Sequence, residues 1–168
     1  MSLFSSDDDL QSLAAELGRC LQQREFVIAT AESCTGGWVA KILTDIPGSS
    51  AWFDRGFVTY SNEAKQEMLG VDPEIIDANG AVSEATARAM AEGVLNNSRA
   101  SVSLAITGIA GPGGGTPYKP VGLVWFAWAG GGQPVGSVDH IFEGDRESIR
   151  RQAVLRALHG VRDRLDGC

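Results

Sequence analysis

The sequence predicts an α/β fold in which helices cover both faces of one mixed parallel and antiparallel sheet. First, short apolar runs alternate with segments of helical periodicity along most of the chain, which is typical of a parallel sheet with helical crossovers. Second, two strand-like runs near the C-terminus flank a glycine-rich turn, which indicates an antiparallel hairpin. Third, a length of 168 residues suits one domain. We therefore expect a single-domain three-layer α/β/α sandwich spanning residues 1–168, without repeats or linkers.

The chain is expected to open with a helix that begins near Ser6. The acidic residues that follow suit the positive end of a helix dipole. Apolar residues then recur at helical spacing, namely Leu10, Leu13, Ala14, Leu17 and Leu21. Residues 26–31 (FVIATA) predict a buried strand, and residues 36–46 predict a helix that Pro47 and Gly48 end.

A second strand and helix follow. Residues 56–61 (GFVTYS) predict a strand, residues 62–69 (NEAKQEML) a helix, and residues 73–78 a further short helical piece. Because a helix separates successive strands, these strands are expected to be parallel.

The third strand is expected at residues 101–107 (SVSLAIT). Before it, Ser83 is a plausible N-cap for a helix over residues 84–97. After it, residues 108–122 form a long loop rich in glycine and proline.

The C-terminal part predicts a hairpin and a helix. Residues 123–129 and 135–142 are the two strands, and residues 130–133 are the turn. The last helix is expected to begin near Asp145, with an apolar face made of Ile149, Ala153, Val154, Leu158, Val161 and Leu165.

Charge argues against nucleic acid as a partner. The formal net charge is −7 and the isoelectric point is near 4.8, whereas nonspecific nucleic-acid binding rests on many lysine and arginine contacts. A small anionic ligand remains compatible, since one or two local cations can hold it.

The cysteines and histidines suggest neither a disulfide framework nor a zinc site. Cys20, Cys34 and Cys168 are odd in number and lack a short spacing, and His140 and His159 are far apart. The N-terminal segment shows no basic and apolar leader pattern, and no segment approaches 18 uninterrupted apolar residues. We expect a protein of a reducing cytoplasm, without contact to a membrane, a metal or a cofactor.

The first candidate for chemistry is the turn in AESCTGG, where a buried strand passes into a helix. Ligands of open α/β sheets usually lie beyond the carboxyl ends of strands, near free N–H groups of helix N-termini. Ser33 offers a hydroxyl at that place, and Thr35, Gly36 and Gly37 would let the backbone approach a substrate. The alternative is that Ser33 or Thr35 only caps the following helix.

A second cluster, YSNEAK, follows the neighbouring strand. Tyr60 and Lys65 could reach the same rim as Ser33. A serine needs a proton acceptor to become nucleophilic, and a buried lysine with a lowered pKa can serve, with tyrosine as a proton relay. Ser33, Lys65 and Tyr60 are thus the one complete nucleophile set that the sequence offers. The alternative is that Lys65 is a solvated helix charge.

Cys34 is a rival nucleophile. A thiol at a helix N-terminus has a lowered pKa and can attack carbonyl groups. Cysteine is, however, among the residues most often buried, and Cys34 directly follows an apolar strand.

The glycine-rich loop matches neither the dinucleotide nor the phosphate-loop pattern, because Thr116 stands where a glycine is required and no G-K-[ST] occurs. The loop still leaves a buried strand at the same edge of the sheet. Thr107, Gly108, Ala110 and Gly111 could offer backbone N–H groups to an oxyanion or a phosphate. A long surface loop without such a role is the alternative.

Two arginines open the last predicted helix. Arg146 and Arg150 lie one helical turn apart in FEGDRESIR and could clamp a phosphate at the helix N-terminus. The same spacing is common in solvated helices.

The sequence resembles the CinA C-terminal domain family over nearly its whole length. The motifs that carry the resemblance are TAESCTGG, GSSAWFDRGFVTYSNEAK, GAVSE, GIAGPGGGTP.KPVG and F.GDR..IR. Tyr118 stands where an acidic or polar residue is expected, which we interpret as a surface variation. Longer members carry an additional N-terminal domain.

The resemblance implies metal-free hydrolysis of the carboxamide of nicotinamide mononucleotide to nicotinate mononucleotide and ammonia, in pyridine nucleotide recycling. By position, it makes Ser33 the nucleophile, Lys65 the base and Tyr60 its partner. A binding module that senses a nucleotide without turnover is the competing class, and an interaction scaffold is a third. The apolar run at residues 123–129, in a possible edge hairpin, also suggests a homo-oligomer.

Overall fold

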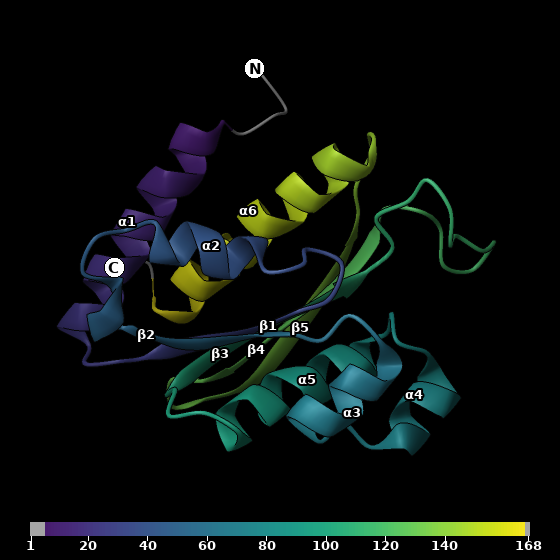
Figure 1. Cartoon of the computed structure of the whole chain (residues 1–168), viewed down its shortest axis with the longest axis horizontal. Coiled ribbons are helices and arrows are strands. Elements are labelled where there is room, and N and C mark those ends of the chain that lie inside the picture. Colours follow the sequence, from purple (N-terminus) through teal and green to yellow (C-terminus); the bar gives the residue numbers. More distant parts are fainter. Residues whose placement is uncertain (1–5, 167–168) are drawn as a thin grey trace.

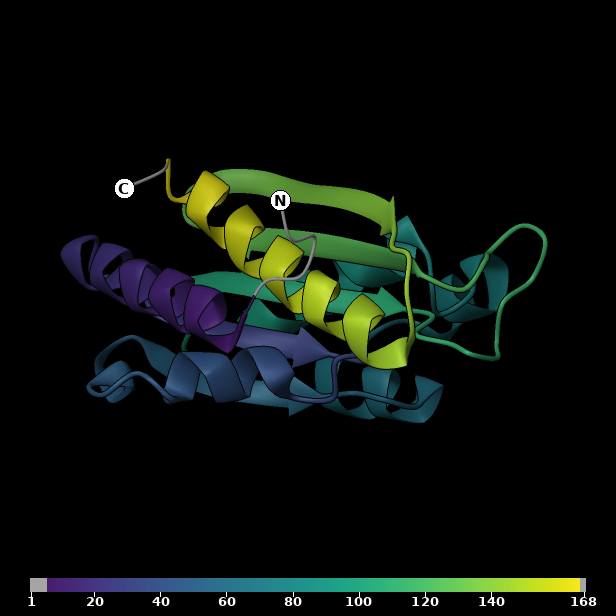
Figure 2. The same ribbon diagram turned by 90° about the horizontal axis from the view of Figure 1, so that it is seen from above.

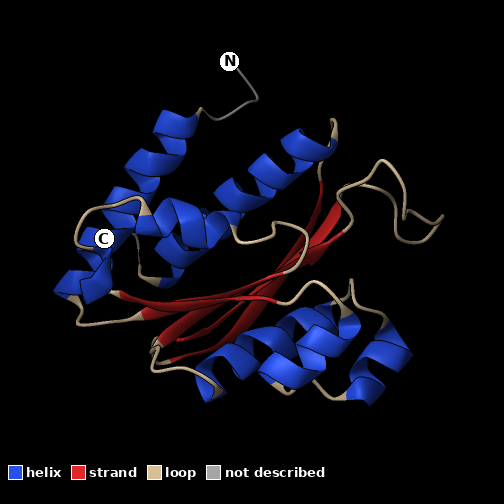
Figure 3. Ribbon diagram, in the orientation of Figure 1, coloured by secondary structure: helices blue, strands red, loops and turns tan. Residues whose placement is uncertain are grey.

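The computed structural model describes residues 6–166 and confirms the α/β fold with a mixed sheet. Three layers are visible in Figure 1, with the sheet between two groups of helices. The same layers stand out by element type in Figure 3.

The elements alternate along the chain as expected. The strands are β1 (Ile28–Glu32), β2 (Phe53–Val58), β3 (Val102–Gly108), β4 (Leu123–Gly130) and β5 (Gln133–Ile141). The helices are α1 (Asp7–Gln23), α2 (Trp38–Thr44), α3 (Asn62–Leu69), α4 (Pro73–Asn79), α5 (Glu84–Asn96) and α6 (Arg146–Arg164), and a short 3₁₀ helix, η1, spans Ser49–Ala51.

The sheet has the order β2-β1-β3-β4-β5. Strand β1 pairs in parallel with β2 and with β3, whereas β4 and β5 add antiparallel pairs. The carboxyl ends of β1, β2 and β3 therefore meet at one edge of the sheet, where ligands of such folds usually bind.

Each face of the sheet has its own core. Helices α1, α2 and α6 lie side by side over one face (Figure 2), and their apolar residues pack with Ile28, Leu104 and Phe126. Helices α3, α4 and α5 cover the other face, where Ala29, Ala31 and the apolar side of α5 pack together. Since side chains alternate along a strand, successive residues of β1 contact different cores.

Helix caps explain several boundaries. Ser6 forms a capping box with Asp9 at α1, and Ser61, Ser83 and Asp145 accept hydrogen bonds from the first turns of α3, α5 and α6. The N-cap at Ser83 is thereby confirmed.

The second strand was predicted too late. It begins at Phe53 and ends at Val58, so that residues 59–61 form a loop rather than strand. Thr59 still donates its backbone N–H to the Glu32 carbonyl, and Ser61 caps α3. The error matters because this loop holds Tyr60.

Two expectations about the surface and the cysteines need correction. The β4–β5 hairpin does form one edge of the sheet, but the apolar run at residues 123–129 belongs to β4, which lies between β3 and β5 and is mostly buried, so this run is not an exposed patch. Cys20 is engaged in a disulfide, which the cysteine count did not suggest, whereas Cys34 is free. Cys168 lies outside the described residues. Over residues 6–166, no helix is both long and apolar enough to cross a membrane.

Candidate active site

The turn after β1 is built by strand alternation. Ile28 packs into the core under α1, α2 and α6, so Glu32, four residues later, faces the same side, whereas Ser33 faces the side of α3 and α5. Ser33 still belongs to the sheet edge, since its N–H donates to the Ile106 carbonyl at 3.0 Å. The local sequence therefore sends the carboxylate toward α2 and the hydroxyl toward α3.

Ser33 and Lys65 meet on that side. Lys65 Nζ lies 3.2 Å from Ser33 Oγ, and the two side chains are 1% and 8% exposed. Nζ also donates to the carbonyls of Thr59 at 3.0 Å and Tyr60 at 3.3 Å. The structure thus brings together two residues that are 32 positions apart in the sequence.

Burial lowers the pKa of Lys65. No Asp or Glu side chain forms an ion pair with Lys65 within residues 6–166, so no carboxylate holds the ammonium form. A neutral amine has two N–H donors and one lone pair. In the structure Nζ donates to Ser33 Oγ, and the Ser33 hydroxyl donates to the Tyr60 carbonyl at 3.5 Å. When the amine is neutral, the two carbonyls can take its donors, and rotation of the Ser33 hydroxyl brings the hydroxyl proton to the lone pair.

Tyr60 contacts the base through its backbone. Its carbonyl accepts from Lys65, while its side chain is 62% exposed and its hydroxyl accepts from Arg146 Nη2 at 3.2 Å. The phenol therefore lies at the rim of the site, and the described contacts include none between its oxygen and Nζ.

A cavity of about 210 Å³ adjoins the pair. It opens between the ends of β1 and β3, the start of α3 and the segment before α5. Its lining comprises Ser33, Cys34, Tyr60, Asn62, Lys65, Ala81, Val82, Thr107, Gly108, Ala110 and Arg146. Asn62, Ala81 and Val82 were not among the expected site residues, although Ala81 and Val82 belong to the GAVSE motif and Asn62 directly follows YS.

Backbone contacts hold the far wall of this cavity. Thr107 Oγ1 donates to the Ala81 carbonyl at 2.8 Å, which ties the end of β3 to the segment before α5. Arg146 Nη1 donates to the Gly111 carbonyl at 2.7 Å, so Gly111 contacts the arginine without lining the cavity itself. Gly111 has φ 78°, and a Cβ there would lie 2.5 Å from Val121, so this position needs glycine.

Cys34 does not have the properties of a reactive thiol. Burial raises its pKa to about 12, so the thiolate is scarce at neutral pH. Its side chain lines the cavity but is only 6% exposed. The environment favours Ser33 over Cys34 as nucleophile.

Glu32 anchors the turn from the side of α2. Its Oε1 accepts from Thr35 Oγ1 at 2.7 Å and from Val39 N at 2.8 Å, and its Oε2 accepts from Ala40 N at 3.1 Å. Burial raises the pKa of this carboxyl, while the N–H donors favour its charged form. The Thr35 hydroxyl is thereby committed to Glu32 and is part of a cap.

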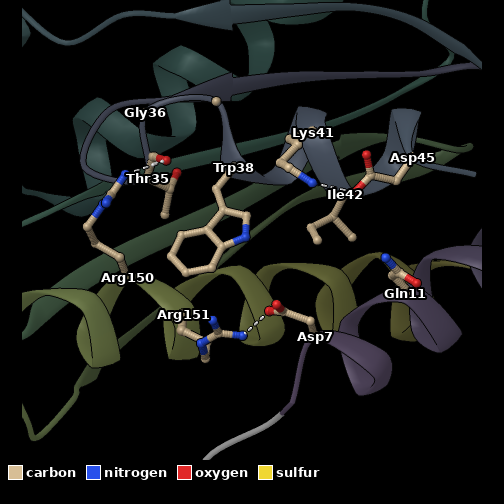
Figure 4. A pocket seen from close by; sticks show the side chains of 11 residues that line it. Asp7, Gln11, Thr35, Gly36, Trp38, Lys41, Ile42, Asp45, Arg150 and Arg151 are labelled. Atoms are coloured by element: carbon tan, nitrogen blue, oxygen red, sulfur yellow. Dashed lines mark hydrogen bonds and ion pairs between the residues drawn. The ribbon is translucent and has the colours of Figure 1, made fainter.

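The expected substrate-binding residues other than Gly111 divide between two cavities. Thr35, Gly36, Gly37 and Arg150 line a second cavity of about 420 Å³ between α1, α2 and α6 (Figure 4), whose lining does not include Ser33. Arg150 donates to the backbone carbonyls of Cys34 and Thr35 at 3.0 and 3.2 Å. Arg146 and Arg150 therefore do not form one clamp.

Comparison with known proteins agrees with this architecture. The sequence model of the CinA C-terminal domain family matches residues 10–165. The nicotinamide-nucleotide amidohydrolase PncC of Escherichia coli (strain K12) is 52% identical over 153 residues, which are 91% of this chain and 93% of that protein. The protein of the same name from Pseudomonas putida is 48% identical over 154 residues, covering 92% and 96% of the two chains.

Solved structures share the fold. The competence/damage inducible protein CihA from Agrobacterium tumefaciens superposes with a TM-score of 0.90 at 45% identity, over 98% of this chain and 99% of that one. A longer relative, a putative competence-damage inducible protein of Symbiobacterium thermophilum, is 51% identical over 98% of this chain but only 40% of its own length.

Proposed function

The chain belongs to the CinA C-terminal domain family, and from this membership and the Ser33–Lys65 contact we propose that it is a nicotinamide-nucleotide amidohydrolase. It would convert nicotinamide mononucleotide and water to nicotinate mononucleotide and ammonia. The observation that carries the proposal is the buried Nζ of Lys65, 3.2 Å from Ser33 Oγ in a cavity and without a carboxylate partner among the described residues.

The first half of the reaction acylates the enzyme. Neutral Lys65 takes the hydroxyl proton of Ser33 as Oγ attacks the carboxamide carbon, and the carbonyl oxygen becomes an oxyanion. When this tetrahedral intermediate collapses, the C–N bond breaks and the ammonium of Lys65 returns the proton to the leaving nitrogen. Ammonia departs and an ester to Ser33 remains.

The second half hydrolyses the ester. Lys65, neutral again, takes a proton from water, the resulting hydroxide attacks the ester carbon, and Ser33 Oγ leaves with the proton that Lys65 gives back. Nicotinate mononucleotide forms as the carboxylic acid, which gives its proton to water or to the released ammonia and becomes the carboxylate, and the starting serine is restored. Neither half needs a metal or a cofactor.

Tyr60 and Arg146 would orient the nucleotide. In this proposal the Tyr60 carbonyl holds Lys65 Nζ in place. The Tyr60 phenol and the Arg146 guanidinium, which are hydrogen-bonded to each other, form the rim of the cavity, over which the ribose phosphate of the substrate would lie. Arg146 remains a candidate for the phosphate because it lines the cavity with Ser33.

The cell context is a further part of the proposal. The reaction would serve pyridine nucleotide recycling in the cytoplasm, where its substrate and product are cofactor precursors. Self-association into a homo-oligomer stays a prediction, and sedimentation of the full chain tests it.

The experiment is a comparison of product formation by the wild type, Ser33→Ala and Cys34→Ala. Ammonia and nicotinate mononucleotide are measured after incubation with nicotinamide mononucleotide. We expect turnover by the wild type and Cys34→Ala, and none by Ser33→Ala. A wild type that is stabilised against heat by the nucleotide but releases no ammonia would favour a sensor instead.

A further inference from the structure

We propose that Arg150 is a positioning residue that fixes the backbone after Ser33 so that the N–H groups of Cys34 and Thr35 form the oxyanion hole. The inference rests on the proposed serine mechanism and assigns Arg150 a task other than binding phosphate.

Arg150 donates hydrogen bonds to two backbone carbonyls of the turn that follows Ser33. Its Nε donates to the Cys34 carbonyl at 3.0 Å and its Nη2 to the Thr35 carbonyl at 3.2 Å. Figure 4 shows the guanidinium against Thr35, with the Trp38 indole beside it. The guanidinium carbon lies 5.6 Å from the Trp38 ring centroid, which adds a cation–π contact that holds the side chain. A planar fork on two successive carbonyls fixes two successive peptide planes.

Peptide geometry converts these contacts into a direction for the donors. In a trans peptide the C=O of one residue and the N–H of the next point in opposite directions. The one cis bond among the described residues is Gly111–Pro112, so the peptide between Cys34 and Thr35 is trans. Because Arg150 reaches the Cys34 carbonyl from α6, the Thr35 N–H is turned away from α6, toward the side where α3 carries Lys65 (Figure 1).

The preceding peptide is fixed by the turn itself. The Ser33 carbonyl accepts from Gly36 N at 3.1 Å, which sets the orientation of the Cys34 N–H in the same way. This bend requires positive φ at Gly36 and Gly37, with values of 61° and 99°. The two glycines of the sequence TGG therefore permit the bend that orients the backbone N–H groups after Ser33.

Neither Cys34 N nor Thr35 N donates a hydrogen bond to another residue of the range 6–166. Both residues are buried, at 6% and 0% exposure, and the one contact described for either N–H group is that of Cys34 N with its own thiol, a weak acceptor. A buried N–H group without a good partner costs free energy. An oxyanion on the carbon attacked by Ser33 would satisfy both, since they are the two N–H groups that follow the nucleophile.

The second cavity allows a test of this proposal by chemical rescue, because it borders Arg150. It borders Arg150, Gly36 and Trp38 on the side of α6 and is open enough, at about 420 Å³, to admit a small ion. If Arg150 is truncated to alanine, a guanidinium ion from solution can occupy the vacated place and bridge the same two carbonyls. A structural or phosphate-binding role predicts no such rescue of the chemical step.

The test compares Arg150→Ala, Arg150→Lys and the control Arg151→Ala. Arg151 lies on the same helix with its guanidinium carbon 5.0 Å from the same indole, but its ion pairs go to Asp7 and Glu147 and not to the turn. Removing one oxyanion donor costs about 10²–10³-fold in kcat in comparable enzymes. We expect a kcat loss of that order for Arg150→Ala with KM for nicotinamide mononucleotide little changed, a smaller loss for Arg150→Lys, and none for Arg151→Ala.

Guanidinium chloride, well below denaturing concentrations, should raise kcat of Arg150→Ala and leave the wild type and Arg151→Ala unchanged. A raised KM with normal kcat would overturn the proposal in favour of phosphate binding, and a normal kcat with normal KM would overturn it outright. Should Arg150→Ala fail to fold, a folded Arg150→Lys with wild-type kcat refutes it equally.

A second substrate separates this inference from the proposed function. The release of nitrophenolate from p-nitrophenyl acetate in a burst reports acylation of Ser33 whatever the natural amide is. A wild type that gives the burst but no ammonia from nicotinamide mononucleotide refutes the proposed substrate alone. Equal bursts from the wild type and Arg150→Ala refute the role of Arg150 alone.

Discussion

Replacing Lys65 by methionine tests the chemistry and the burial of its amine together. The side chain is 1% exposed, and methionine fills similar volume without a proton acceptor. General base catalysis contributes about 10²–10⁴-fold, so Lys65→Met should lower kcat by at least that order. Lys65→Arg is the matched control, because it keeps a cation that cannot be deprotonated, and it should be as inactive.

The stability of Lys65→Met follows from the hydrogen bonds that it loses. Nζ donates to the Thr59 and Tyr60 carbonyls, and each such bond contributes a net of about 0.5–1.5 kcal/mol. Methionine also avoids the free-energy cost of burying a titratable amine, and this gain offsets part of the loss of hydrogen bonds. We expect the free energy of unfolding in urea at neutral pH to fall by less than about 3 kcal/mol.

The contribution of Lys65 to the free energy of unfolding should increase with pH. Burial lowers the pKa of Lys65 below its ordinary value of 10.5 in the folded chain, whereas the unfolded chain keeps the ordinary value. Between these two pKa values the unfolded chain binds the extra proton, so the stability conferred by Lys65 rises with pH and levels off above 10.5. Each pH unit of that window adds about 1.4 kcal/mol to the wild type relative to Lys65→Met.

Urea unfolding of both proteins from neutral pH to about the lysine pKa measures this difference, since groups common to the two proteins cancel. The rate should follow the same titration, with kcat/KM rising with pH through the lowered pKa of Lys65. A constant difference in stability together with an active Lys65→Arg would refute a neutral amine as the base.

Four other substitutions extend the account. Cys34→Ala should keep wild-type turnover, and thiol reagents should label Cys34 slowly in the folded wild type because its pKa is raised to about 12; loss of turnover would restore the thiol as nucleophile. Tyr60→Phe removes one exposed hydrogen bond and should lower kcat/KM by no more than about tenfold, whereas a relay through the phenol requires a loss of about 10²-fold or more. Glu32→Gln sets an amide donor against the N–H groups of α2 and should lower the free energy of unfolding by about 1–3 kcal/mol in urea, with an unchanged midpoint counting against the cap. Gly93→Ala would put a Cβ 2.2 Å from the Leu69 carbonyl oxygen and should cost about 1–3 kcal/mol by the same assay, and a neutral result would contradict the tight packing of α3 on α5.

Local signals were sufficient for most of the fold. Helix α3 was predicted with its observed bounds, although Ser61 was assigned to the preceding strand. In the structure Ser61 caps this helix, and Gly70 ends it in a left-handed conformation. Strand β2 was misplaced, because it lies at the sheet edge and carries the charged residues Asp54 and Arg55, of which Arg55 is exposed, where a buried strand would be apolar.

The candidate site could be predicted in part. The sequence predicted that Ser33 and Lys65 lie at one edge of the sheet, because each follows a strand and the carboxyl ends of parallel strands meet at the same edge. The task of Arg150 could not be read from its spacing to Arg146, since residues one helical turn apart diverge when one reaches a neighbouring turn and the other a loop. Only the position of α6 against the turn distinguishes Arg146, which lines the cavity of Ser33, from Arg150, which donates to the turn after Ser33.

The most direct measurement of the central claim is the identity of the covalent intermediate. Wild-type enzyme mixed with nicotinamide mononucleotide is quenched in acid within the first turnover, digested, and examined by mass spectrometry. The mechanism predicts a nicotinate mononucleotide ester on the side chain of Ser33, which should be absent from Ser33→Ala and present in Cys34→Ala. An adduct on Cys34, or ammonia release by Ser33→Ala at the wild-type rate, would contradict it.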